Sequence, residues 1–167
     1  MSSSMTGWVP DAVVAMGRRD AHRISVGKAK DAHSVSQDRI NEILAEEAGK
    51  GLRVVRLKSG DPMIFGRAGE EIAALRAANV PYEIVPGVTA AFAAAASAEI
   101  PLTLRGLTSS LVFATCHDKD SETLPDWAGL ALSGSTVAVY MGRTVAGRVA
   151  DRLREAGLDD DTPVMAI

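Results

Sequence analysis

Two short loops carry the residues whose types and spacing could bind a small ligand. The first, Ser59-Gly60-Asp61-Pro62, directly follows the apolar run of residues 52–57. Its glycine permits close backbone approach, its carboxylate accepts hydrogen bonds from hydroxyl or ammonium groups, and its proline restricts the turn. The second, Val85-Pro86-Gly87-Val88-Thr89-Ala90, places Thr89 where a helix would expose unpaired N–H groups. Taken alone, each loop is better explained as an ordinary tight turn or helix cap.

Other reactive residue types are isolated in the sequence. Lys28 follows Gly27 at the end of a short apolar run, where an amine could donate a proton or pair with an anion. His33 and His117 stand alone, as solvated or structural histidines do. Cys116 is the only cysteine, so a thiolate zinc cluster is excluded, and we predict no metal site and no nucleophilic role for this thiol. The motifs of dinucleotide and nucleoside-triphosphate sites are absent.

Composition narrows the class of protein. The 167 residues are 47% hydrophobic and 23% charged, which is typical of folded domains with a core. A net charge of -3 and 4% aromatic residues favour no nucleic-acid partner. A single cysteine suits a reducing compartment, and we predict a cytoplasmic protein. The first six residues do not resemble a signal peptide, and the run 90–98 is too short for a bilayer, so no membrane partner is expected.

The elements that must position the two loops alternate between strand and helix. The first part of the chain predicts strands at 24–26, 52–57 and 82–85, and helices at 10–20, 36–48, 70–79 and 89–98. This order is typical of a parallel α/β sheet, in which ligands bind beyond the carboxyl ends of strands. A second α/β domain is predicted to begin at residue 104, with strands at 111–115, 136–141 and 163–167 and a helix at 145–156.

Several segments together resemble the uroporphyrinogen-III C-methyltransferases of the tetrapyrrole methylase superfamily, the methyltransferase module of siroheme synthases. The matching segments are Arg18-Arg19-Asp20-Ala21, Val26-Gly27-Lys28, His33-Ser34-Val35-Ser36-Gln37, residues 54–67, Val85-Pro86-Gly87-Val88-Thr89-Ala90, Ile100-Pro101-Leu102-Thr103 and Val139-Tyr140-Met141-Gly142. They cover the chain from about residue 9 to its end. Because several motifs occur in register, the resemblance favours ligand sites over simple turns at both loops.

The resemblance implies a two-domain α/β fold, with an incomplete parallel-sheet domain over 1–103 and an incomplete mixed-sheet domain over 104–167. It implies an S-adenosyl-L-methionine-dependent homodimer that methylates uroporphyrinogen III to precorrin-2, for siroheme and cobalamin synthesis. Lys28 matches the proton donor of the family. The cofactor contacts implied are Ser59, Gly60, Asp61, Ile64, Thr89, Ala90 and Met141. The candidate contacts for the carboxylate-rich substrate, which guanidinium groups would bind well, are Arg67, Arg105, His33 and Gln37.

The sequence also departs from the family pattern. No first strand with a glycine- and proline-rich loop is recognisable, and no aspartate stands near Thr6, where the family has a proton acceptor. Ser59 and Cys116 each replace a usual glycine, and a C-terminal cofactor segment is not found. Two alternatives therefore stay open: a truncated, non-catalytic fragment of such an enzyme, or a related precorrin methyltransferase.

Overall fold

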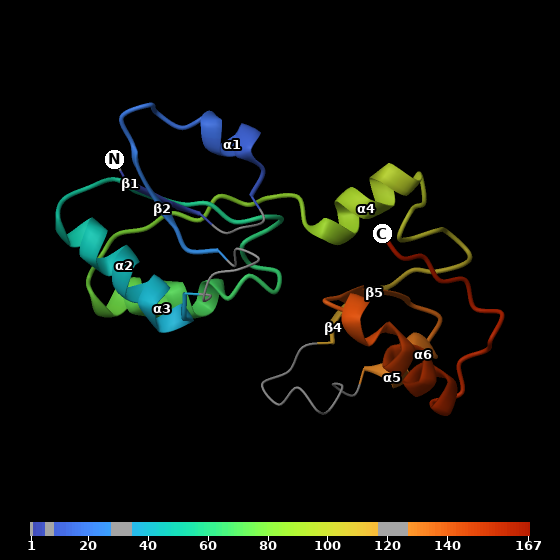
Figure 1. Ribbon diagram of the computed structural model, residues 1–167. Helices are drawn as coiled ribbons and strands as arrows, with labels where there is room; N and C mark the ends of the chain where they lie inside the picture. The colour runs from blue at the N-terminus through green and yellow to red at the C-terminus, as the bar shows by residue number, and fades with distance from the viewer. Residues whose placement is uncertain (1, 6–8, 28–34, 117–126) are drawn as a thin grey trace. The chain divides into compact units, whose positions relative to one another are not determined.

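The computed structural model describes residues 2–5, 9–27, 35–116 and 127–167 (Figure 1). The chain forms two compact units, Met1–Thr89 and Ala90–Ile167. The predicted domain boundary between residues 103 and 104 stays a prediction. The first unit contains β1 (Ser2–Met5), α1 (Asp11–Ala15), β2 (His22–Ser25), α2 (Gln37–Gly49), β3 (Val54–Arg56) and α3 (Ala68–Ala77). The second contains α4 (Ala90–Ala98), β4 (Leu111–Thr115), α5 (Ala128–Ala131), β5 (Thr136–Tyr140), the 3-10 helix η1 (Arg143–Val145) and α6 (Ala146–Glu155).

A parallel three-stranded sheet with the order β2-β1-β3 forms the base of the first unit. Ser2, at the start of the central strand, is in register with His22 of β2 and Val54 of β3. No strand is predicted from the sequence before residue 24, because a run of serines has no apolar alternation. The structure corrects that expectation. Both strand pairings that the structure describes in this sheet are parallel.

Helices α2 and α3 lie beside each other on one face of this sheet (Figure 1). Helix α2 begins where the sequence predicts, because the Ser36 hydroxyl accepts a hydrogen bond from the backbone N–H of Arg39 at 3.2 Å. Ile40 and Leu44 are buried on its inner face and pack with Val26. Residues partly buried around this core are Ile24, Val35, Ile43, Val54 and Leu75. The core therefore joins both helices to β3, whose carboxyl end carries the first loop.

Two predicted strands do not form. Residues 82–85 lie in a stretch with neither helix nor strand, and all four side chains are exposed. Residues 163–167 also lack regular structure. β-Branched side chains favour a strand only where a neighbouring strand supplies backbone hydrogen bonds. Among the strands that the structure describes, none pairs with either segment.

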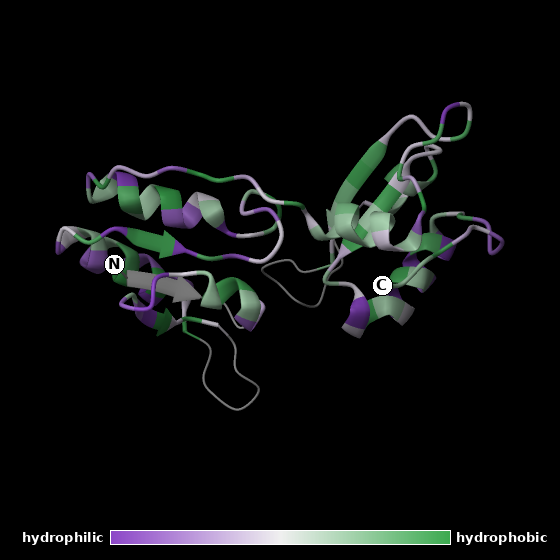
Figure 2. Cartoon of the chain, turned by 90° about the horizontal axis from the view of Figure 1, so that it is seen from above, coloured by the Kyte–Doolittle hydropathy of each residue, from purple (hydrophilic) through white to green (hydrophobic). Residues whose placement is uncertain are grey.

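The second unit is organised around one parallel strand pair, β4 with β5, in register from Leu111 and Thr136 to Thr115 and Tyr140. Its strands are largely green in Figure 2, the colour of hydrophobic residues. Helix α6 supplies Val149 and Leu153 to a core around three buried residues, Ala114, Cys116 and Trp127. The short helices α5 and η1 are not predicted from the sequence. The mixed sheet predicted for this half stays a prediction, because the described strands make a single parallel pair.

The thiol of Cys116 is shielded in that core. The residue is 8% exposed, and burial raises the pKa of its thiol. Because the thiolate is the reactive form, we expect native Cys116 to be alkylated at least roughly tenfold more slowly at pH 8 than the same thiol in urea. Mass spectrometry of iodoacetamide-treated protein measures both rates. Equal rates in the two conditions would contradict this placement of the thiol.

Candidate functional site

The two loops singled out in the sequence meet in the first unit. Asp61 lies beyond the carboxyl end of β3, and its Oδ1 accepts a hydrogen bond from the backbone N–H of Met63 at 2.8 Å. Its Oδ2 accepts another from the backbone N–H of Gly87 at 2.9 Å. The first contact is an Asx turn, and the second joins loops that are 26 residues apart in the chain. Asp61 thus connects both candidate ligand loops at the edge where parallel sheets bind ligands.

Glycine is required where the loops touch. A Cβ built on Gly87 would overlap the carbonyl oxygen of Gly60, and backbone atoms cannot turn aside as a side chain can. Gly60 itself has a φ of 73°, in the left-handed region that glycine adopts without strain. A Cβ on Gly66 would likewise overlap the carbonyl oxygen of Pro62. The loop after β3 is therefore closed on itself and on its neighbour through backbone contacts.

A buried ionic cluster lies at the base of this loop. Glu71 of α3 is 5% exposed and forms ion pairs with Lys58 at 2.8 Å and with Arg56 at 3.1 Å. Gln37 of α2 also donates a hydrogen bond to Glu71, at 3.2 Å. Burial is the main cause that lowers the pKa of Lys58, and the ion pair with Glu71 opposes it. The Glu71 carboxylate of α3 therefore links α2 to the end of β3 and to Lys58, the residue directly before Ser59.

The predicted substrate residues that the structure describes lie in different surroundings. Gln37 belongs to the cluster just described, and it also donates a hydrogen bond to Asn41 at 3.0 Å. Arg67 has a φ of 55° and forms a bidentate ion pair with Glu70 at 2.6 and 2.7 Å. Arg105 is exposed on the second unit. His33 and the predicted proton donor Lys28 lie outside the described residues.

The remaining predicted cofactor residues occupy characteristic places in their elements. Ser59 is exposed and Ile64 is half-buried in the loop after β3, whereas Thr89 is buried, at 5% exposure. In the second unit, Ala90 begins α4. Met141 directly follows β5, is 52% exposed and has a φ of 58°. A left-handed conformation is uncommon for a residue other than glycine, and such residues are frequent at functional sites.

One contact in the second unit is missed by sequence reasoning. The hydroxyl of Tyr140, the residue before Met141, accepts a hydrogen bond from the backbone N–H of Ala91 at 3.0 Å. The two residues are 49 positions apart. An aromatic residue in an apolar strand predicts core packing, so no signal in the sequence identifies this hydroxyl.

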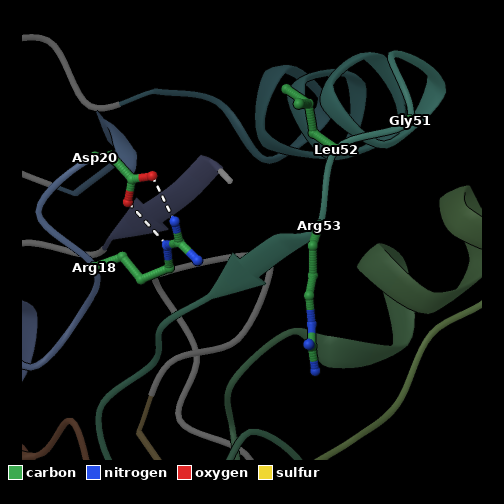
Figure 3. A pocket seen from close by; sticks show the side chains of 5 residues that line it. All are labelled: Arg18, Asp20, Gly51, Leu52 and Arg53. Carbon is green, nitrogen blue, oxygen red and sulfur yellow. Dashed lines mark hydrogen bonds and ion pairs between the residues drawn. The ribbon is translucent and has the colours of Figure 1, made fainter.

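A surface pocket of about 370 Å³ lies near the amino ends of the strands of the first sheet, opposite to the carboxyl end where Asp61 lies (Figure 3). Its lining residues are Arg18, Asp20, Gly51, Leu52 and Arg53, at the amino ends of β2 and β3. Arg18 is already paired with Asp20 at 2.6 Å, and its hydrogen bond lowers the pKa of that carboxyl to about 2. Arg53 points away from this pair (Figure 3). Because ligands of parallel sheets bind at the carboxyl ends, we place the candidate site at Asp61 instead.

In ranges 2–5, 9–27, 35–116 and 127–167, no group of three or more His, Cys, Asp or Glu side chains gathers as metal ligands would. Within the same part of the chain, no helix is long and apolar enough to cross a membrane.

The chain matches a known protein family and several curated and solved relatives. The family described as Tetrapyrrole (Corrin/Porphyrin) Methylases matches residues 3–167. Siroheme synthase 1 of Cronobacter sakazakii is 50% identical over 159 residues, which are 95% of this chain and 34% of that protein. The chain thus spans about a third of the length of the curated relatives it matches.

Two solved structures share the fold. A cobalt precorrin-4 methyltransferase of cobalamin biosynthesis matches with a TM-score of 0.80 and 27% identity, covering 96% of this chain and 66% of its own. Uroporphyrin-III C-methyltransferase from Thermus thermophilus, in complex with S-adenosyl homocysteine, matches with a TM-score of 0.76 and 31% identity. That match covers 95% of this chain and 65% of the Thermus chain.

Proposed function

Because this chain belongs to the tetrapyrrole methylase family, we propose that it takes part in the S-adenosyl-L-methionine-dependent C-methylation of uroporphyrinogen III to precorrin-2. The observation that carries the proposal is the Asp61 carboxylate, which joins two loops at the ligand-binding edge of a parallel sheet. Both loops belong to a chain that is 50% identical to a siroheme synthase. Siroheme and cobalamin are the end products that this reaction would serve.

Sequence identity supports uroporphyrinogen III over a later precorrin as the substrate. The two solved relatives have similar TM-scores, 0.80 and 0.76, so the path of the backbone does not separate them. Identity is 31% to the uroporphyrin-III enzyme and 27% to the cobalt precorrin-4 enzyme. A match over residues 3–167 favours a methyltransferase over a non-catalytic fragment. We further propose two α/β domains, a cytoplasmic location and a homodimer, on the strength of the family resemblance.

The residues of the first loop suit a cofactor that carries hydroxyl and ammonium groups. A carboxylate has about four lone-pair sites, and two of those on Asp61 are used by backbone N–H groups. The others can accept hydrogen bonds from a ligand while the carboxylate still holds both loops. We propose Ser59, Gly60, Asp61, Ile64, Thr89, Ala90 and Met141 as the cofactor contacts.

In this reaction the protein mainly has to position the two reactants and assist proton transfer. When bound, the cofactor supplies a methyl group that is already activated on a sulfonium sulfur. The pyrrole carbon of the substrate is nucleophilic, so the side chains must orient it, exclude water and assist proton transfer to and from the tetrapyrrole, which loses one proton to solvent or to a basic group for each methyl group that it gains. We propose Lys28 as the proton donor. Arg67, Arg105, His33 and Gln37 are the proposed substrate contacts, and Arg67 would exchange Glu70 for a substrate carboxylate.

Methyl transfer tests the proposal directly. The chain is incubated with methyl-labelled S-adenosyl-L-methionine and uroporphyrinogen III under reducing, anaerobic conditions. We expect label to appear in the tetrapyrrole fraction, with two methyl groups in the final product. Label that stays entirely in the cofactor would contradict the proposed reaction.

A matched pair of variants ties that activity to the loops. Asp61→Asn replaces one acceptor oxygen by an N–H donor that faces a backbone N–H, which should cost about 1.5–3 kcal/mol of binding or loop stability. Transfer at limiting cofactor should fall about tenfold or more. Asp159→Asn is the control for the same change of side chain. Asp159 accepts a hydrogen bond from the backbone N–H of Asp161 at 3.0 Å, in an exposed turn of the second unit that is not proposed to bind the cofactor. Its activity should equal that of the wild type.

A further inference from the structure

We propose that the hydroxyl of Tyr140 is a positioning group, which holds the start of α4 and the residue after β5 in one arrangement for the cofactor. The proposal rests on the proposed function, because Ala90 and Met141 are cofactor contacts only under that function. Tyr140 itself is not proposed to touch the cofactor. It acts on the two neighbours through which the second unit would do so.

The hydroxyl satisfies a backbone group that the helix cannot. The first N–H groups of an α-helix have no acceptor within the helix. Ala91 is the second residue of α4, and its N–H donates to the Tyr140 hydroxyl at 3.0 Å. Both residues are half-buried, so water replaces this acceptor less readily than at an exposed helix end. The hydrogen bond therefore ties the position of Ala90 to that of β5.

The direction of the hydroxyl is set by a row of three aromatic rings. The Tyr140 ring meets Phe113 of β4 edge-to-face, with centroids 5.9 Å apart and an interplanar angle of 86°. Phe113 in turn contacts Phe92 of α4, with centroids 5.8 Å apart. Edge-to-face and tilted pairs at these distances are the favourable arrangements for aromatic side chains. The same helix end is thus held by one hydrogen bond and by ring packing, which a substitution can separate.

The backbone of Tyr140 carries the constraint on to Met141. Tyr140 is paired with Thr115 at the end of the β4–β5 ladder, and its carbonyl accepts a hydrogen bond from the N–H of Cys116 at 3.1 Å. Met141 follows at once with a φ of 58°, a conformation that persists only where its surroundings hold it. Movement of Tyr140 would therefore reach Met141 and Ala90 together.

Tyr140→Phe removes the hydroxyl and keeps the ring. We expect the dissociation constant of S-adenosylhomocysteine, measured by isothermal titration calorimetry, to rise about tenfold, as the loss of one net hydrogen bond predicts. Tyr82→Phe is the matched control, because the Tyr82 hydroxyl accepts a hydrogen bond from Arg76 at 2.8 Å in the first unit. That variant should bind within about twofold of the wild type. A loss of equal size in both variants would show a general effect of hydroxyl removal and would overturn the proposal.

Hydrogen exchange without any ligand tests the same contact independently. The Ala91 amide should exchange faster in Tyr140→Phe than in the wild type, and the NMR signal of Met141 should shift. Unchanged exchange at Ala91, or wild-type affinity of the variant, would overturn the positioning role. A wild-type chain that binds no S-adenosylhomocysteine would refute the proposed function and the role in cofactor binding. The exchange of Ala91 would still decide whether the hydroxyl holds α4 to β5.

Discussion

Gly87→Ala should lower the affinity for S-adenosylhomocysteine by about tenfold or more. The added methyl group would overlap the carbonyl oxygen of Gly60, so the two loops must separate. Separation breaks the hydrogen bond from the Gly87 N–H to Asp61, and overpacking of this kind typically costs about 1–3 kcal/mol. Calorimetric titration gives the affinity, and urea unfolding gives the free energy of unfolding of the same sample.

Gly69→Ala provides the control for the added methyl group. Gly69 lies in α3, and a Cβ there would meet no atom within 4 Å. Alanine is the better helix former, so this variant should gain up to about 1 kcal/mol of stability and bind like the wild type. If Gly87→Ala also bound like the wild type, the joined loops would not be part of the cofactor site.

Glu71→Ala should cost the first unit about 3–5 kcal/mol of unfolding free energy, because removal of one partner leaves buried charges without compensation. The side chains of Arg56, Lys58 and Glu71 are only 13%, 11% and 7% exposed, so solvent screens them little. Loss of the carboxylate also removes the interaction that raises the pKa of Lys58, and the pKa should fall further. Urea unfolding followed by circular dichroism measures the free energy.

The comparison that isolates burial is Glu42→Ala. Glu42 is 60% exposed and pairs with Arg39 along α2, so its removal should leave the free energy of unfolding almost unchanged. Glu71→Gln keeps the shape and one acceptor oxygen, and it should be more stable than Glu71→Ala. This second variant keeps the experiment informative if the alanine variant does not fold. A loss below about 1 kcal/mol for Glu71→Ala would contradict the structural role of the cluster.

Local signals in the sequence predict the longer helices and four of the five described strands, β2 to β5, but not the short helices α5 and η1. Ser36 is a cap that acts on a residue three positions away, so its role can be read from neighbouring residues. Strand β1 could not be predicted, because its serines give no periodic signal and its place depends on two partners distant in sequence. Residues 82–85 show the converse case, in which strand propensity finds no partner among the described strands.

The sequence predicts which residues belong to the candidate site, but not the contacts between them. The resemblance to a family identified Asp61 and the loop of Gly87, yet the hydrogen bond between them spans 26 residues and has no local pattern. Glu71 reads in the sequence as one more charge on a helix, and only the fold buries it against two cations. Tyr140 reads as a core aromatic residue, and only the fold brings its hydroxyl to α4. Long-range contacts of this kind depend on the packing of whole elements.

We propose that the two loops joined by Asp61 bind the methyl-donor cofactor. Titration of the isotope-labelled chain with S-adenosylhomocysteine, followed by backbone amide NMR, tests it most directly. We predict saturable shifts at Gly60, Asp61, Gly87, Ala90 and Met141 that fit one dissociation constant. The absence of saturable shifts, or shifts confined to the pocket of Arg18, Gly51 and Arg53, would contradict it.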